Sequence, residues 1–149
     1  MAGGIHVTVE ASVPAFAAVD VRAVTERAVR ATLADRDVER AEISVTLVDD
    51  AVMTAMNRQW KGRDATTDVL AFPLHEPHEP ILGDVYLGLE QAARQAVELG
   101  EPPDRELSRL AIHGTLHVLG LDHPDEGREE SKMWKHQERI LATLGGDLA

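Results

Sequence analysis

The spacing of apolar residues predicts alternating strands and helices in the first part of the chain. Apolar and polar residues alternate from Ile5 to Glu10, as they do in a half-buried strand. From Asp20 to about Ala34 the apolar residues instead recur at the spacing of an amphipathic helix. The β-branched run from Ile43 to Val48 predicts a second strand.

The rest of the chain continues these patterns and predicts an α+β fold. About four strands are expected, with helices that cover at least one face of the sheet. The further expected elements are a helix capped by Asp49 or Asp50, a loop and short strand within Asn57–Pro73, a strand over 82–89, a helix over 90–99 ended by Gly100, a helix that starts at Pro102 or Pro103, and a final helix over 127–144 ended by Gly145 and Gly146.

Length and composition predict one domain, residues 1–149. The chain is 44% hydrophobic, and no linker or repeat divides it. It has no cysteine, no signal-peptide pattern and no apolar run long enough to span a bilayer, so a soluble, cytoplasmic protein is expected. The net charge of −11 argues against broad, nonspecific binding of nucleic acid but leaves room for a local basic groove.

Three of the seven histidines are spaced as ligands of one metal ion. His113 and His117 are four residues apart, so both imidazoles lie on one face of a helix. Gly120 can end that helix and let the chain return His123 as a third ligand. Three nitrogen ligands leave a fourth position open for water or substrate, as in catalytic zinc sites. The alternative is three unrelated surface or core histidines.

The remaining apolar residues of this helix form one stripe, and the two histidines are expected beside it, where they flank the core. Gly114 lies on the stripe, where it would let a neighbouring element pack closely. The stripe consists of Leu107, Leu110, Ala111, Gly114 and Val118.

A basic segment stands out in this acidic chain. The segment from Asn57 to Thr67 contains three basic residues and a single acidic one, which predicts an anion-binding site. The basic residues are Arg58, Lys61 and Arg63. The alternative is the ordinary preference of basic residues for a helix C-terminus.

Other candidate groups carry less specific signals. Arg109 lies four residues before His113 and is a further candidate contact for RNA; partnership with a local acid is the alternative. His75 and His78 lie in a proline-rich loop and are expected to be loop residues.

A bound metal favours hydrolysis, with a peptide or a phosphodiester as substrate. The spacing of the histidines matches that of metzincin proteases, but those carry a glutamate as general base where this chain has Gly114. RNA provides its own 2′-hydroxyl nucleophile, so metal and cationic side chains can suffice. Phosphodiester cleavage is therefore favoured, and the general base stays unassigned.

The chain resembles the bacterial YbeY family of ribosomal RNA maturation factors and metal-dependent endoribonucleases. The resemblance rests on the pattern His113-Gly-x-x-His117-x-x-Gly-x-Asp-His123, on the Asn57–Pro73 segment and on Leu82-Gly-Asp. It extends over nearly the whole chain, including Met133, Glu138 and the region of Leu141.

The resemblance implies one zinc or similar ion on His113, His117 and His123, in a helix beside a small mixed sheet. It also implies cleavage of single-stranded RNA during maturation of the 3′ end of small-subunit ribosomal RNA, and a role in ribosome quality control with ribosomal partners. Lys61 would contact phosphate or the transition state, although the family usually has arginine there. Further departures from the family pattern are Ala65-Thr66 and Ala71.

Two alternatives to the endoribonuclease remain. One is a non-catalytic assembly factor whose metal braces the fold and whose cationic groove binds RNA or a ribosomal protein. The weaker one is a metallopeptidase.

Overall fold

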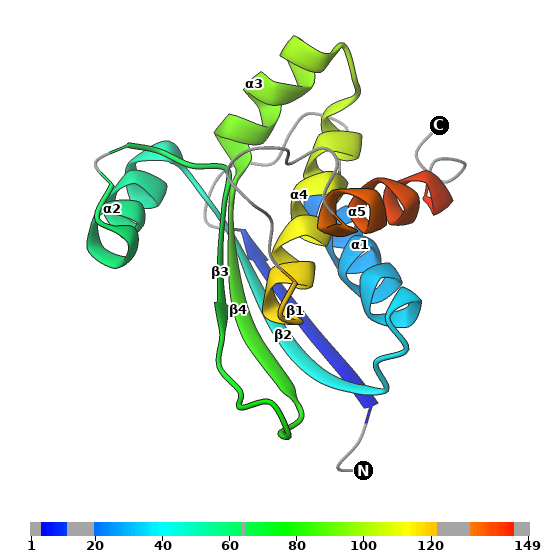
Figure 1. Cartoon of the computed structure of the whole chain (residues 1–149). Coiled ribbons are helices and arrows are strands. Elements are labelled where there is room, and N and C mark those ends of the chain that lie inside the picture. The colour runs from blue at the N-terminus through cyan, green and yellow to red at the C-terminus, as the bar shows by residue number, and fades with distance from the viewer. Residues whose placement is uncertain (1–3, 12–19, 64, 122–131, 145–149) are drawn as a thin grey trace.

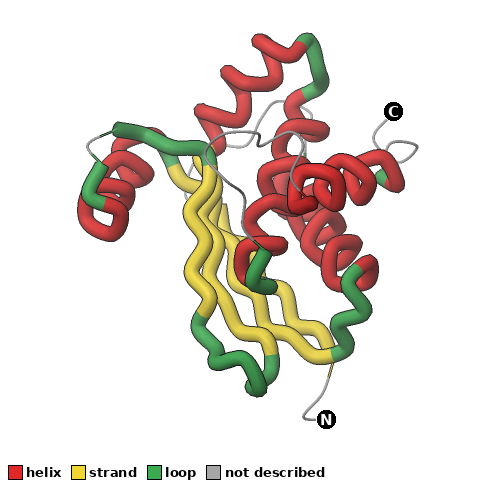
Figure 2. The backbone as a smooth tube through the Cα atoms, in the orientation of Figure 1, coloured by secondary structure: helices red, strands yellow, loops and turns green. Residues whose placement is uncertain are grey.

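The computed structural model describes residues 4–11, 20–63, 65–121 and 132–144. It shows a four-stranded sheet with most of the helices packed against one face (Figures 1 and 2). The strands are β1 (Gly4–Ala11), β2 (Arg40–Val48), β3 (Val69–Pro73) and β4 (Ile81–Gly88), and the helices are α1 (Val21–Asp35), α2 (Asp50–Lys61), α3 (Leu89–Leu99), α4 (Pro103–Val118) and α5 (Lys132–Thr143).

The strand order is β1-β2-β4-β3, which makes the sheet mixed. β2 pairs in parallel with both β1 and β4, so Val45 lies between Val9 and Val85. β3 is an edge strand, antiparallel to β4. The predicted α+β fold with a small mixed sheet of about four strands is thereby confirmed.

Capping residues in the sequence correctly predict most of the helix ends. The Asp20 carboxylate accepts a hydrogen bond from the backbone N–H of Ala23 (3.1 Å), and Asp49 caps α2 through the N–H of Val52 (2.9 Å). Gly100 ends α3 in the left-handed conformation, as expected. β2 begins at Arg40, earlier than the predicted Ile43, because partners on both sides pair with its first residues.

Helix α4 lies at the centre of the fold. The sheet, α1, α3 and α5 all pack against it (Figure 1). Between Glu106 and Val118 every residue is buried except Arg109 and His117. The prediction of a single apolar stripe flanked by both histidines is therefore wrong for His113, which is only 5% exposed. The apolar periodicity of α4 identifies the side of the helix that faces the sheet. The helices that pack on its other sides also bury polar residues of α4, which periodicity does not predict.

A smaller apolar cluster lies apart from the main core. Met53 of α2 packs with Val48 and Leu70, and Phe72 and Tyr86 lie beside them. Figure 1 shows α2 beyond the β3 edge, away from α1 and α5. Among the described residues, no helix has both the length and the apolar character needed to cross a membrane.

The backbone of α4 comes very close to the sheet at Gly114. A Cβ atom there would lie 2.6 Å from Cγ1 of Val85 and 3.1 Å from Cγ2 of Val69. A similar approach occurs where Gly83 of β4 faces Val118, since a Cβ on Gly83 would lie 2.5 Å from the valine Cγ1. The predicted packing role of Gly114 is confirmed, and two glycines set the distance between α4 and the sheet.

We expect Gly114→Ala to lower the free energy of unfolding by about 1–3 kcal/mol through overpacking, despite a helix-propensity gain of about 1 kcal/mol. Urea unfolding would measure the loss. Val85→Ala in the same chain removes the clashing methyl groups, so the double variant should lose less than the sum of the two single losses. Additive losses would contradict the proposed contact.

Candidate metal centre

His113 and His117 bring two imidazole nitrogens together on α4. Their Nε2 atoms are 3.1 Å apart, and the ring planes are inclined at 77°. Two nitrogens bound at about 2.0–2.1 Å to one tetrahedral zinc ion lie about 3.3 Å apart. The pair therefore fits a shared metal ion with little movement of either ring.

The chain turns sharply after these histidines. Gly120 is left-handed, with φ of 96°, its N–H donates to the carbonyl of His117 (2.9 Å), and the N–H of Leu121 donates to that of Leu116 (3.0 Å). This pair of bonds is a Schellman motif, which ends a helix and reverses the chain. The predicted end of the helix at Gly120 is confirmed.

His123 lies outside the described residues, so its role as third ligand stays a prediction. Among the described residues, no group of three or more histidine, aspartate or glutamate side chains is placed to hold an ion. His75, as expected, is a loop residue, and its Nδ1 accepts from the N–H of Leu82 (3.2 Å).

The other nitrogen of the buried His113 ring faces helix α5. Nδ1 lies 2.6 Å from Oε1 of Gln137, which is only 2% exposed, and the Gln137 Nε2 donates to Oε2 of Glu138 (3.0 Å). Sequence reasoning missed Gln137. The signal was a polar residue on the otherwise apolar face of α5 formed by Met133, Ile140 and Leu141.

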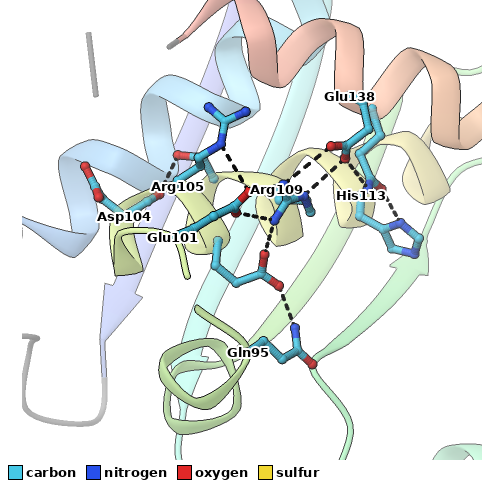
Figure 3. Close-up of polar contacts among 10 residues, drawn as sticks. Gln95, Glu101, Asp104, Arg105, Arg109, His113 and Glu138 are labelled. Atoms are coloured by element: carbon cyan, nitrogen blue, oxygen red, sulfur yellow. Dashed lines mark hydrogen bonds and ion pairs between the residues drawn. The ribbon is translucent and has the colours of Figure 1, made fainter. Parts of the chain in front are cut away.

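Arg109 lies at the centre of a cluster of carboxylates (Figure 3). Its guanidinium donates to Glu101 (2.8 Å), to Glu138 (3.1 Å) and to Glu106. These hydrogen bonds raise the already high pKa of Arg109 despite its burial, so the group stays charged. In the structure Arg109 contacts local acids, which is the alternative that its position in the sequence left open. Contact between Arg109 and RNA stays a prediction.

Two of the three carboxylates in this cluster have pKa values that are shifted in opposite directions. Burial raises the pKa of Glu106, although Arg109 and Gln95 donate to it. The hydrogen bond from Arg109 lowers the pKa of the more accessible Glu101. The pKa of Glu106 thus responds mainly to burial, and that of Glu101 mainly to its hydrogen bond with Arg109.

A cavity of about 460 Å³ opens beside this cluster and the buried histidine. Three carboxylates and one guanidinium contribute to its walls beside apolar side chains, so its charged groups are mainly acidic. It is lined by Asp68, Gln95, Glu98, Leu99, Glu106, Arg109, Leu110, His113, Trp134 and Gln137.

The predicted basic segment lies at the end of α2 and does not line this cavity. Arg58, Lys61 and Arg63 are all exposed. The Lys61 Nζ sits 5.6 Å from the centre of the Phe72 ring in β3. The Asn57 side chain, which is buried, donates to the carbonyl of Ala65 (2.8 Å) and so ties the segment to the helix.

Comparison with known proteins shows extensive similarity to one family. Residues 7–145 match the family model described as Endoribonuclease YbeY. The chain is 42% identical over 123 residues to Endoribonuclease YbeY from Persephonella marina, covering 80% of each chain. It is 39% identical over 142 residues to the protein of the same name from Roseiflexus castenholzii, covering 89% of each.

A solved structure has the same fold. The solution structure of TM1509 from Thermotoga maritima matches with a TM-score of 0.67, covering 95% of this chain and 91% of that one. Their sequences are 23% identical.

Stability should respond to pH in opposite ways when Glu106 and Glu101 are neutralised. The raised pKa of Glu106 means that its contribution to stability is lost as pH rises through and above the ordinary glutamate value. The lowered pKa of Glu101 means that its contribution is present above the ordinary value and lost as pH falls. Relative to wild type, Glu106→Gln should therefore gain stability as pH rises above about 4, and Glu101→Gln should lose stability as pH rises from the acid side to about pH 5 and then stay level. Urea unfolding at several pH values would test this, and equal slopes for the two variants would contradict it.

Proposed function

The chain belongs to the endoribonuclease YbeY family, and we propose that it cleaves single-stranded RNA with the help of one zinc or similar metal ion. Family membership makes it a hydrolase that cuts RNA chains internally in ribosomal RNA processing. The metal, its ligands and the precise substrate are the proposed parts.

The observation that carries the metal proposal is the separation of 3.1 Å between the Nε2 atoms of His113 and His117. His113 and His117 would hold the ion, with His123 as third ligand. A zinc ion there would supply Lewis acidity that polarises a phosphoryl oxygen and lowers the pKa of bound water. The buried His113 is held by α5, so α4 and α5 together would orient the ligands.

The basic segment supports RNA as the substrate. Lys61, Arg58 and Arg63 would contact phosphates, and Lys61 is the leading candidate to stabilise the transition state. Trp60 beside them is 59% exposed, and its ring packs edge-on against Phe72 at 6.0 Å between centroids. An exposed indole offers a surface on which an unpaired base can stack, which favours a single-stranded substrate.

The biological substrate we propose is the 3′ end of small-subunit ribosomal RNA, with the subunit or its assembly proteins as partners and a role in ribosome quality control. Such a substrate would place the protein in the cytoplasm. Gly114 disfavours the metallopeptidase alternative, since it occupies the position of the protease base and packs against Val85.

We expect His117→Ala to abolish RNA cleavage by the purified protein while the domain stays folded. Loss of a ligand should weaken zinc binding by more than the roughly 10–100-fold typical for residues that only support a ligand. Calorimetric zinc titration, circular dichroism and a cleavage assay on a single-stranded ribosomal RNA fragment would be run side by side. Full cleavage by this variant would refute a catalytic metal, and cooperative unfolding on chelation of wild type would favour the bracing alternative.

Lys61→Ala should keep zinc affinity but weaken RNA binding and reduce the slope of log K against log salt by about 0.7, the value for one phosphate contact on a single strand. Lys61→Arg should restore the slope, since the charge returns. Lys135→Ala, the same change at an exposed position of α5, is the matched control and should leave the slope unchanged. An unchanged slope in Lys61→Ala would rule out phosphate contact by this residue.

A further inference from the structure

We propose that Arg109, Glu138 and Gln137 form a directional relay that fixes the proton of His113 on Nδ1 and leaves the Nε2 lone pair facing His117. Gln137 and Glu138 are positioning residues in this proposal. The inference deepens the proposed function, because the lone pair at Nε2 is the one a metal ion would use.

The relay begins at a group whose charge does not change. Arg109 is only 12% exposed through its side chain and stays protonated, since several carboxylates surround it. Its Nε donates to Oε2 of Glu138 at 3.1 Å (Figure 3). A guanidinium has donors and no acceptor, so the Glu138 oxygen must be the acceptor in this contact.

An ionised carboxylate can only accept hydrogen bonds, and this sets the direction of the next group. Glu138 Oε2 lies 3.0 Å from an amide atom of Gln137, and that atom must be the NH₂ donor. The carbonyl Oε1 of Gln137 then points the other way. Gln137 is only 2% exposed, so its amide depends on protein partners for its hydrogen bonds.

The carbonyl in turn fixes the histidine tautomer. Oε1 of Gln137 is 2.6 Å from Nδ1 of His113, and a carbonyl oxygen accepts only from a protonated nitrogen. In the neutral ring, a proton on Nδ1 leaves Nε2 unprotonated. That atom is the one 3.1 Å from Nε2 of His117. The relay therefore prepares His113 for metal ligation before any ion binds.

Glu138→Gln is the sharpest test because it keeps the shape of the side chain and removes the charge that makes the carboxylate an acceptor only. An amide at this position can donate as well as accept, so Gln137 is free to reverse and His113 to carry its proton on Nε2. Long-range ¹H–¹⁵N NMR of the metal-free protein, at a pH where the ring is neutral, reads the tautomer directly. Wild type should show protonated Nδ1, and Glu138→Gln should show a mixture.

Glu101→Gln is the matched control. Glu101 also accepts from Arg109, at 2.8 Å, whereas the Gln137 amide donates to Glu138. The same Glu-to-Gln change there should preserve the wild-type tautomer. An equal tautomer shift in both variants would overturn the directional relay in favour of a general effect of charge.

Gln137→Leu removes the acceptor and should lower zinc affinity by about 10–100-fold, the usual effect of removing a partner that orients a metal ligand. Circular dichroism would establish that each variant is folded. Wild-type tautomer and affinity in Gln137→Leu, or protonated Nε2 in wild type, would overturn the proposal. Absence of zinc binding by wild type would instead overturn the proposed metal site, while the metal-free tautomer measurement would still decide the relay.

Discussion

The close contact of α4 with the sheet at Gly114 is the constraint on which the rest of the structure depends. Gly114 directly follows His113 in the sequence. The helical turn that lies closest to the sheet, at Gly114, therefore also carries His113 on a different face. With the helix held against Val85, α1, α3 and α5 can enclose its remaining sides. The placement of both histidine rings is therefore a product of core packing, since they lie on the helix whose distance from β4 is set at Gly114.

Enclosure of α4 also explains the unusual electrostatics beside it. A helix buried on nearly all sides still carries Glu106, Arg109 and His113, and each needs polar partners because burial without them costs several kcal/mol. Glu101 from the loop before α4 and Glu138 from α5 meet this need for Arg109. In a chain with net charge −11, one guanidinium thereby binds acids together that would otherwise repel.

Much of this arrangement could be predicted from local signals. Apolar periodicity, aspartate N-caps and glycines at helix C-termini depend only on residues close together in the sequence. They predicted the helices, the strands and the turn at Gly120. The spacing of His113 and His117 predicted their common face because four residues make slightly more than one helical turn. The burial of His113 could not be predicted in this way, since it depends on which distant helices cover α4. The separation of the basic segment from the cavity has the same origin, because it depends on the side of the β3 edge on which α2 packs.

Gln137 shows what a sequence can and cannot convey about a polar group in a core. Its place among Met133, Ile140 and Leu141 marks it as a buried residue that must have hydrogen-bond partners. Nothing nearby in the sequence says that those partners are Glu138 on one side and a histidine 24 positions away on the other. Once both contacts are known, the charge of Arg109 sets the direction of the three hydrogen bonds that lead to His113. Arg109 can only donate to Glu138, Glu138 can only accept from Gln137, and the Gln137 carbonyl can only accept from His113. In the proposed relay, a fixed charge at the centre of the carboxylate cluster thus determines the protonation of a nitrogen that it does not contact.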